Sequence, residues 1–373
     1  MATALAIRDS IEEWALRHGI LSTSAGPRGA DDGADVTLVP FSAQHADYFR
    51  TRHIVRVTAT KSPSSSVTIF SSQKIARSKE AEMRKVFSEV YGDKIELRFD
   101  VSKPFRIDQA VQEYGRFEPI LKHGGLIACG SSVGLGNQRN AGTLTALARG
   151  KRSDKGLYGI SCNHVVGGCN TARPGTPIVV PGIQDVSSDH PDITVIGYHA
   201  RAAAMSQGLP GVFDITRNHD IACFAVNDEA GLTSIQGYGD EAYDTPSSFI
   251  DDPPQRGLQV KKWGRSTGFT RGEVDAVSVR EYVEYDVTSY YGPMNSQRFR
   301  GTVYYKLVYE VSSISGPFSL GGDSGALVVT NDGKKEKIVG MVIAGTRLKS
   351  LVLPFQDGLN ELGLSIIRKH NTG

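Results

Sequence analysis

The sequence predicts a mainly β protein in which a barrel or sandwich of short antiparallel strands follows a small α/β unit. Glycine makes up 41 of the 373 residues, above the roughly 7% of an average protein, which favours a turn-rich fold. From about Leu126 onward, short apolar runs alternate with Gly, Pro, Asn and Asp, and no long helical period appears before the last 20 residues. A chain of this length is expected to form two or three compact units.

The first predicted element is a helix over residues 1–20, in which apolar and charged residues alternate at helical spacing. Asp9, Glu12 and Glu13 interrupt the continuous apolar core that a secretory signal needs. We therefore expect an amphipathic helix and not an export signal. Residues 24–35 follow with the Gly-, Pro- and Asp-rich composition of a linker.

A small α/β unit is predicted next. Its elements are strands at residues 53–60, 65–72 and 94–101 and a helix at residues 78–92. Ser78 is the expected N-cap of this helix, and Gly92 lies near its end. Residues 1–110 are therefore predicted to form an N-terminal helix plus a small α/β accessory domain.

The remaining chain is divided into short apolar runs that predict strands. These runs are residues 142–148, 157–166, 193–200, 220–226, 302–311, 325–330 and 338–345. The tyrosine-rich residues 280–311 alternate large and polar side chains on either side of a turn, as in a long β-hairpin. Aromatic residues interleaved with Arg and Lys also suit single-stranded nucleic acid. We favour cross-strand aromatic pairing within the hairpin.

The charge of the chain is nearly balanced, with 42 Lys and Arg against 40 Asp and Glu. This balance gives no reason to expect nucleic acid or an anionic membrane as a partner. No window approaches 18 uninterrupted apolar residues, so we expect no membrane span. Four cysteines are too few for a disulfide scaffold, and reduced thiols are expected. These features predict a cytoplasmic protein.

The main signal for chemistry is the tetrapeptide GDSG at residues 322–325, which places Ser324 on a glycine-rich turn before an apolar run. A serine hydroxyl is a weak nucleophile, so a hydrolase also needs a base, usually His, and a carboxylate that orients this base. His164 ends one apolar strand pattern and Asp220 opens another. The order His164, Asp220, Ser324, with separations of 56 and 104 residues, is one of the chain orders of a catalytic triad.

Each of these residues also has a structural interpretation. GDSG can make an ordinary turn, a histidine at a strand end is often structural, and Asp220 can cap the start of its strand. We favour catalysis because the three residues occur together in this order. His219 is expected to be a solvent-facing neighbour, and Asp214 is the alternative carboxylate.

The segments GDSG, NHV around His164 and DIA from Asp220 resemble a trypsin-like serine peptidase of the chymotrypsin fold. The resemblance is greatest to the intracellular branch of bacteria and plants, whose members carry HV rather than AHC around the histidine. NAGTL at residues 140–144 and VKKWGRSTGFTRG at residues 260–272 agree with the starts of the two barrels. The resemblance covers residues 124–365.

The resemblance implies a mainly β fold, a chymotrypsin-like double β-barrel, with the small N-terminal α/β accessory domain outside it. Residues 124–250 would form the first barrel, which carries His164 and Asp220. Residues 255–373 would form the second barrel, which carries Ser324 and ends in a C-terminal helix.

Roles follow from the same resemblance. His164 matches the general base, Asp220 the orienting carboxylate and Ser324 the nucleophile. The backbone amides of Gly322 and Ser324 match the oxyanion donors, each often worth about 3 kcal/mol in the transition state. A glycine suits position 322, since its amide must point into the site in a backbone geometry that a Cβ would hinder.

The chain also departs from the family pattern. Ala326 replaces the glycine that commonly follows GDSG, and no activation site provides the new N-terminus that usually pairs with Asp323. Either an internal cation pairs with Asp323, or the enzyme stays inactive until the chain is cut or a partner binds. Phe318 is expected at the base of the specificity pocket, with Ala344 and Gly345 on its opposite wall. The absence of an acid there argues against Lys or Arg preference and favours a small or apolar substrate residue.

Two other patterns suggest sites that we do not favour. Cys162, His164 and Cys169 lie close in sequence, but zinc sites usually contain a CxxC pair, which is missing. We expect buried thiols around the base and no metal. Residues 133–142, VGLGNQRNAG, lack the third glycine of a dinucleotide loop and the lysine of a P-loop. They are interpreted as a turn.

The sequence therefore predicts a serine endopeptidase with a His-Asp-Ser triad that cleaves a protein or peptide substrate without a cofactor, as an intracellular regulatory or defence protease. The alternative is a protease-fold interaction module with latent or no activity. An intermediate hypothesis is a signalling protease whose N-terminal domain recognises a regulatory protein partner. The same triad would also hydrolyse esters.

Overall fold

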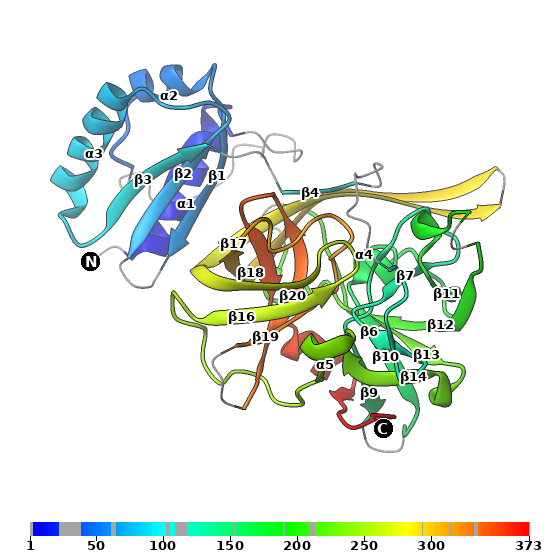
Figure 1. The fold of residues 1–373 in the computed structure, drawn as a ribbon. Coiled ribbons are helices and arrows are strands. Elements are labelled where there is room, and N and C mark those ends of the chain that lie inside the picture. Colours follow the sequence, from blue (N-terminus) through cyan, green and yellow to red (C-terminus); the bar gives the residue numbers. More distant parts are fainter. Residues whose placement is uncertain are drawn as a thin grey trace.

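The computed structural model describes residues 3–21, 39–60, 65–101, 105–108, 118–151, 154–188, 191–208, 213–292, 294–313, 315–331 and 335–372. These residues form two β-barrels and an N-terminal α/β unit that lies to one side of them (Figure 1). The prediction of a mainly β, chymotrypsin-like double β-barrel with a small N-terminal α/β unit is confirmed.

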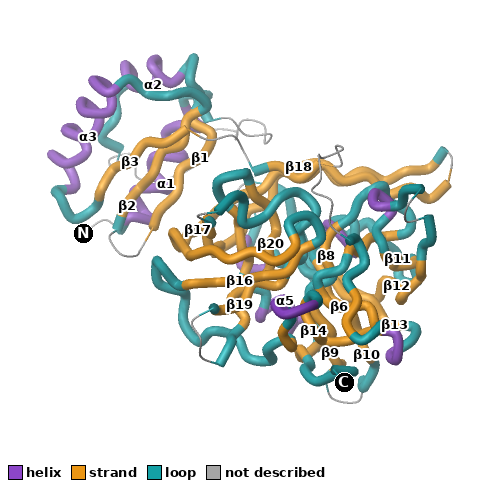
Figure 2. Tube along the Cα trace, viewed as in Figure 1, coloured by secondary structure: helices purple, strands orange, loops and turns teal. Residues whose placement is uncertain are grey.

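In the N-terminal unit, helices pack around three paired strands (Figure 2). Its elements are α1 (Ala4–Arg17), α2 (Ala43–Phe49), β1 (Ile54–Thr60), β2 (Ser66–Ser71), α3 (Arg77–Tyr91) and β3 (Glu96–Val101). β1 pairs antiparallel with β2, and β2 pairs in parallel with β3. α1 buries Ile7, Ile11, Trp14 and Ala15, which share one face of a helix, so this face packs against the sheet.

Helix α3 begins one residue before the predicted start. Ala76 is the N-cap, and its amide donates to the Tyr48 hydroxyl at 2.9 Å. The prediction that Ser78 caps the helix is therefore wrong, because Ser78 already lies in the first turn. Gly92 ends the helix as predicted, with a φ of 67° that favours glycine. The predicted linker at residues 24–35 lies outside the described residues.

The second barrel is a closed ring of strands. Its members are β16 (Gln259–Gly264), β17 (Gly268–Gly292), β18 (Asn295–Ser312), β19 (Leu327–Thr330), β20 (Ile338–Gly345) and β21 (Ser350–Leu353). The strands pair in the order β16, β19, β20, β21, β18, β17, and β17 pairs again with β16, which closes the ring. Strand residues of this barrel bury their apolar side chains inside it, among them Val260, Val274, Val311, Val328 and Val352.

The first barrel is built from two groups of strands. The larger sheet has the order β22 (Leu364–Ile366), β9 (Ala146–Gly150), β10 (Leu157–Ser161), β13 (Ala222–Val226), β12 (Thr194–Ala202), β11 (Pro177–Val180), β7 (Ser132–Leu135), β8 (Gly142–Thr143). The smaller sheet has the order β15 (Tyr243–Asp244), β14 (Leu232–Gln236), β6 (Leu126–Cys129), β5 (Lys122–His123). Short helices connect the strands: α4 (Asn163–Val166), η2 (Ile183–Asp185), η3 (Ile215–Arg217), η4 (Glu229–Gly231) and η5 (Gly239–Glu241).

The predicted C-terminal helix is present but short. It is α5 (Gln356–Glu361), and the chain then returns as β22 to pair with β9 of the first barrel, where Ile366 lies opposite Ala148. The last part of the segment predicted for the second barrel thus completes the sheet of the first. None of the helices in the described part of the chain has the length and apolar character needed to cross a membrane.

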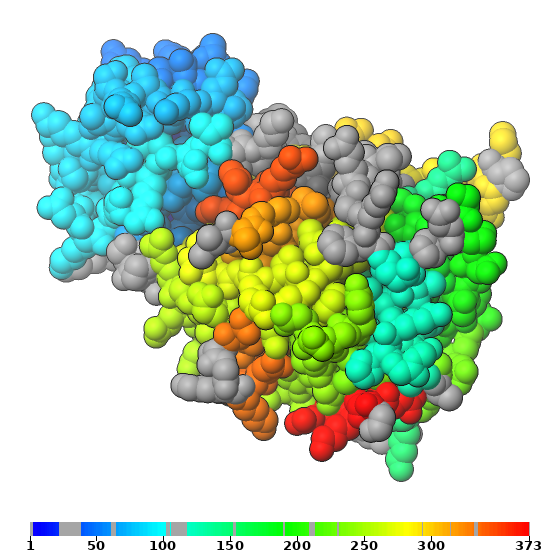
Figure 3. All heavy atoms as spheres, in the orientation of Figure 1, coloured from blue at the N-terminus to red at the C-terminus, as the bar shows by residue number. Residues whose placement is uncertain are grey.

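The hairpin of β17 and β18 connects all three parts of the molecule. It confirms the hairpin predicted for residues 280–311 and extends further toward the N-terminus of β17. β1 of the N-terminal unit pairs with β17, with Thr60 opposite Ser278, and β4 (Arg106–Asp108) runs parallel to β17 further along. The hairpin then projects over the first barrel (Figure 1). In Figure 3, the blue and cyan atoms of the N-terminal unit lie next to yellow and orange atoms of the second barrel.

Candidate active site

His164 and Asp220 meet inside the first barrel. His164 lies in α4, the helical turn that follows β10, and not at a strand end as predicted, since the strand stops at Ser161. Its amide donates to Asp220 Oδ1 at 3.0 Å, and its Nδ1 lies 2.6 Å from Asp220 Oδ2. Asp220 is fully buried, two residues before β13. A carboxylate placed in this way orients the imidazole so that Nε2 faces away from it.

The two neighbouring candidates lie in different environments. Asp214 is the N-cap of η3, where it accepts from the Thr216 amide at 3.0 Å, and this pairing with Thr216 lowers the pKa of its carboxyl. It caps a helix and does not contact His164. His219 is less exposed than predicted: burial lowers its pKa, against the opposing charges of Glu361 and Asp357.

Ser324 lies on a turn that docks against the first barrel. Its carbonyl accepts from the Thr143 amide at 2.8 Å, and the flanking Gly322 and Gly325 have φ values of 96° and 94°. These positive values require glycine, so the sequence of the turn follows from its backbone. Ser324 Oγ donates to the Ile343 carbonyl at 3.4 Å. In this rotamer the hydroxyl is directed to β20 and makes no hydrogen bond to His164 among the described residues.

Two amides of the turn remain available to a ligand. The Asp323 amide donates to Leu320 and the Gly325 amide to Val342. Within the described residues, the Gly322 and Ser324 amides have no acceptor. These are the two donors that the resemblance assigns to the oxyanion, and backbone amides aimed at a developing negative oxygen can stabilise it.

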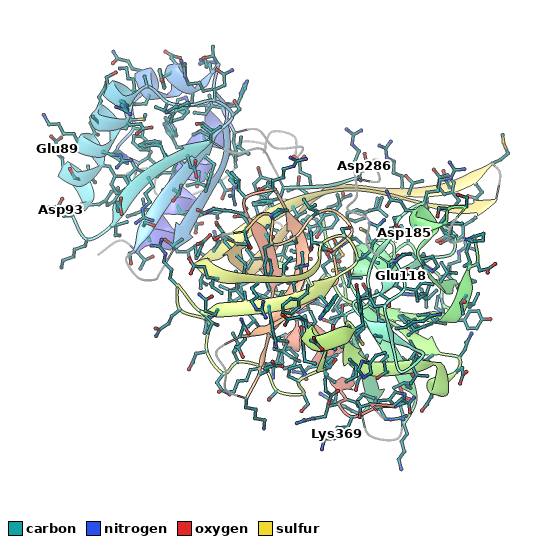
Figure 4. The ribbon with its side chains drawn as sticks, viewed as in Figure 1. Glu89, Asp93, Glu118, Asp185, Asp286 and Lys369 are labelled. Atoms are coloured by element: carbon teal, nitrogen blue, oxygen red, sulfur yellow. The ribbon has the colours of Figure 1, made fainter. Side chains whose placement is uncertain are left out.

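Arg265 was not identified from the sequence, although it packs directly beside the turn. A Cβ at Gly322 would collide with the Arg265 guanidinium and with Ser266 Oγ. Arg265 donates through Nε to Asp185 at 2.5 Å and pairs through Nη2 with the same carboxylate. Asp185 belongs to η2 of the first barrel and is labelled in Figure 4. The ion pair therefore ties the serine turn to the first barrel.

Asp323 has an internal cation, which answers the question that the sequence left open. Lys262 Nζ lies 3.5 Å from Asp323 Oδ2, and both side chains are fully buried. Asp323 also accepts from the amides of Ser266 at 2.7 Å and Leu320 at 2.9 Å, and from Thr267 Oγ1 at 2.7 Å. Burial lowers the pKa of Lys262, and the Asp323 charge opposes this shift. The turn is thus charge-balanced without a cut N-terminus.

The residues predicted for the specificity pocket are spread over core and surface. Phe318 is buried in the core of the second barrel, below Lys262, whose Nζ is 5.7 Å from the ring centroid. Ala344 is buried and Gly345 is exposed at the end of β20. Two serines lie next to Gly345: Ser319 Oγ and Ser350 Oγ are 2.6 Å apart, and Ser319 borders the space a Cβ at Gly345 would fill. Their polarity was not predicted.

His164 belongs to a cluster of three residues of the types that bind metal ions. Cys162, His164 and Asp220 each offer a ligand atom, all within 4.8 Å of one another. Burial and, next, the charge of Asp220 raise the pKa of the Cys162 thiol well above its usual value. This thiol donates to the Val342 carbonyl at 3.4 Å. A protonated, hydrogen-bonded thiol is a poor ligand for zinc, which binds thiolate. Cys169, which lies near Cys162 and His164 in the sequence, is likewise buried, and burial raises the pKa of its thiol.

Tyr285 and Tyr305 are the main site residues that sequence reasoning missed. The Tyr285 hydroxyl donates to Asp220 Oδ2 at 3.0 Å, and its ring lies 5.5 Å from the His164 ring. The hydroxyl of Tyr305 is hydrogen-bonded to that of Tyr285. Burial and then the charge of Asp220 raise the pKa of both phenols well above the usual value, so both keep their protons. The tyrosine-rich pattern of residues 280–311 was the available signal. It predicted a hairpin but did not indicate that one of its tyrosines contacts Asp220.

No family model and no curated protein matches the sequence. Solved structures similar to this chain include Thermobifida fusca protease A, at 16% identity and a TM-score of 0.39, over 65% of this chain and 99% of that one. The Nocardiopsis protease is 18% identical with a TM-score of 0.39, over 64% and 97% of the two chains. Cellulomonas bogoriensis chymotrypsin is 17% identical with a TM-score of 0.36, over 64% and 97%.

Proposed function

We propose that the chain is a serine endopeptidase that cleaves protein or peptide substrates through an acyl-enzyme. The observation that carries this proposal is the pair of hydrogen bonds from His164 to the fully buried Asp220. A buried carboxylate that accepts from both the backbone and the ring of one histidine fixes the tautomer that a general base requires.

In the proposed mechanism Ser324 Oγ rotates away from the Ile343 carbonyl toward His164 Nε2. His164 takes the hydroxyl proton while Oγ attacks the scissile carbonyl carbon, and the Gly322 and Ser324 amides stabilise the oxyanion. The imidazolium then protonates the leaving amine. Water, deprotonated by His164, hydrolyses the acyl-enzyme and restores Ser324.

The proposal is tested by labelling the purified full chain with a fluorophosphonate probe. The wild type is expected to label, whereas Ser324→Ala removes the nucleophile and His164→Ala removes its base. Ser312→Ala, which changes a serine at the end of β18, is a matched control that keeps labelling. Labelling that persists in Ser324→Ala would contradict the assignment. Peptide and ester substrates then separate a peptidase from an esterase.

A latent interaction module is the second candidate, favoured by the contact of Ser324 Oγ with Ile343 instead of His164. The pairing of Asp323 with Lys262 supports the active alternative, because the turn needs no new N-terminus to balance its charge. The absence of probe labelling in folded wild type, together with unchanged partner binding by Ser324→Ala, would support the module.

We propose that the N-terminal unit regulates the activity of the two barrels. We also propose that the protein acts in the cytoplasm. Cys129, Cys162, Cys169 and Cys223 are all buried free thiols, a state typical of a reducing compartment. We infer that residues 1–110 bind a regulatory protein and influence the barrels through the hairpin, as a regulatory or defence protease would require.

A further inference from the structure

Strand β17 contacts the N-terminal unit, the buried carboxylate and the first barrel in succession. Glu281 pairs with Arg56 of β1, and four residues later Tyr285 donates to Asp220. Ser289 then accepts from Gln138 of the first barrel at 2.7 Å. Since side chains alternate along a strand, Glu281, Tyr285 and Ser289 share one face. A displacement of β17 would therefore move the Tyr285 hydroxyl relative to Asp220.

The two tyrosines form a buried hydroxyl chain that ends on Asp220. Tyr285 is 1% exposed and Tyr305 is 0% exposed. The residue opposite Tyr305 across the ladder is Glu281, and Val303 lies opposite Val283 between the two tyrosines. The hydroxyls of the two tyrosines are hydrogen-bonded to each other. Tyr305 is thus the cross-strand neighbour of Glu281, the partner of Arg56, and is hydrogen-bonded to Tyr285.

The N-terminal unit holds this part of the hairpin firmly. The Arg56 guanidinium lies 3.9 Å from the ring centroid of Phe70 and 4.5 Å from that of Phe105, and it is ion-paired with Glu281. Both charged side chains are at most 2% exposed. The Phe105 carbonyl accepts from the Glu284 amide at 2.9 Å, one residue before Tyr285. These contacts fix the backbone from which Tyr285 extends.

We propose that Tyr285, supported by Tyr305, is a positioning residue for Asp220, and that the N-terminal unit acts on the triad through the Arg56–Glu281 pair beside these tyrosines. The inference rests on the proposed function, since it concerns how the same triad is held. The Tyr285 hydroxyl satisfies one lone pair of Asp220 Oδ2 and restricts the carboxylate to the orientation that meets His164. A ligand that displaces β1 against β17 shifts this donor.

The test is Tyr285→Phe in the full chain, which removes one hydroxyl and keeps the ring. We expect kcat/KM to fall about ten-fold, the effect of losing a hydrogen bond to a charged group. The acid limb of the pH profile should move to higher pH, because the carboxylate charge is then shared with His164 alone. The other titratable groups around Asp220 are Cys162, Cys169 and Tyr305. The low-field proton resonance of the His164–Asp220 bond should also shift.

Tyr304→Phe is the matched control. Tyr304 is buried like Tyr305 but points to the opposite face of β18, where its ring lies 5.3 Å from that of Tyr282. Its pH profile and low-field resonance should equal those of the wild type. Equal profiles for Tyr285→Phe and Tyr304→Phe would overturn the positioning role. A wild type that does not label with the fluorophosphonate probe would instead overturn the proposed function.

Coupling to the N-terminal unit is tested by a double-mutant cycle. Arg56→Lys keeps the charge beside Glu281 but loses the flat contact with Phe70 and Phe105. Arg56 and Tyr285 do not touch, so independent effects on kcat/KM would multiply to within about two-fold. We expect a larger deviation in the Arg56→Lys/Tyr285→Phe pair and none in the Arg56→Lys/Tyr304→Phe pair. Multiplicative effects in both pairs would contradict the coupling.

Discussion

Asp220 and Asp323 are both fully buried carboxylates, but their surroundings balance them in different ways. Asp220, in the first barrel, accepts from the His164 amide and ring and from the Tyr285 hydroxyl. Asp323, in the serine turn of the second barrel, faces the buried cation of Lys262 in addition to backbone amides. One carboxylate is held by donors without a permanent charge, the other by a permanent counter-charge.

The difference matches the two tasks that the proposed mechanism assigns. A carboxylate that stabilises an imidazolium must keep its charge available for the moment at which the imidazolium forms. A fixed cation beside Asp220 would spend that charge in the resting state. The charge of Asp323 serves the shape of a turn, and an unbalanced buried charge would destabilise this turn. The two regions should therefore respond in opposite ways to loss of their charges.

The largest expected effect is on activity, at Asp220. Asp220→Asn keeps the size of the side chain but favours the wrong tautomer of His164, so kcat should fall roughly 10⁴-fold. The free energy of unfolding should change by about 1 kcal/mol or less, since no buried cation loses its partner. Active-site titration and urea denaturation measure the two quantities. A variant that loses stability and activity together would place Asp220 in the structural class of Asp323.

The second effect is on stability, at Lys262. Lys262→Met leaves Asp323 buried without its cation, and the free energy of unfolding should fall by about 3–5 kcal/mol. Urea denaturation checks this value. Labelling by a fluorophosphonate should fall as well, because Asp323 shapes the turn that carries the Gly322 and Ser324 amides.

The double variant Lys262→Met/Asp323→Asn removes both charges and separates the two causes. It should recover much of the lost stability, since replacing a buried ion pair with neutral side chains is often close to neutral. If the double variant is as unstable as Lys262→Met alone, the loss arises from packing around Phe318 and not from the unpaired charge.

Sequence pattern was sufficient for most of the fold because its signals are local. β20 has the predicted bounds of residues 338–345, and the apolar alternation of residues 280–311 indicated the hairpin. The joining of β1 to β17 could not be predicted, because Thr60 and Ser278 are more than 200 residues apart and neither strand carries a signal for its partner. Ser78 was mistaken for an N-cap because the helix begins after Ala76 without any side-chain cap.

The candidate site was predictable where chemistry demands particular residue types on particular turns. Motif order singled out His164, Asp220 and Ser324, and the fold brings the first two into contact. The supporting residues carry no such signal. Lys262 lies in an ordinary strand pattern, and Tyr285 is one tyrosine among many in its segment, so only three-dimensional packing assigns each to its carboxylate.

The smallest expected effect concerns acid, to which the Asp220 region should respond through buried histidine. His199 Nδ1 lies 2.9 Å from the Val166 carbonyl of α4, the helix that carries His164. Burial lowers the pKa of His199 below its ordinary 6.5. Between the lowered value and 6.5 the unfolded chain therefore binds more protons than the folded chain, so stability is lost as pH falls through this window.

His199→Gln keeps a donor for Val166 but removes this titration. The free energy of unfolding, measured in urea from pH 7 to pH 5, should therefore decline less steeply in the variant than in the wild type. His219, whose pKa is also lowered by burial, keeps part of the slope. If the free energy of unfolding declines equally with pH in His199→Gln and in the wild type, His199 does not make the Asp220 region sensitive to acid.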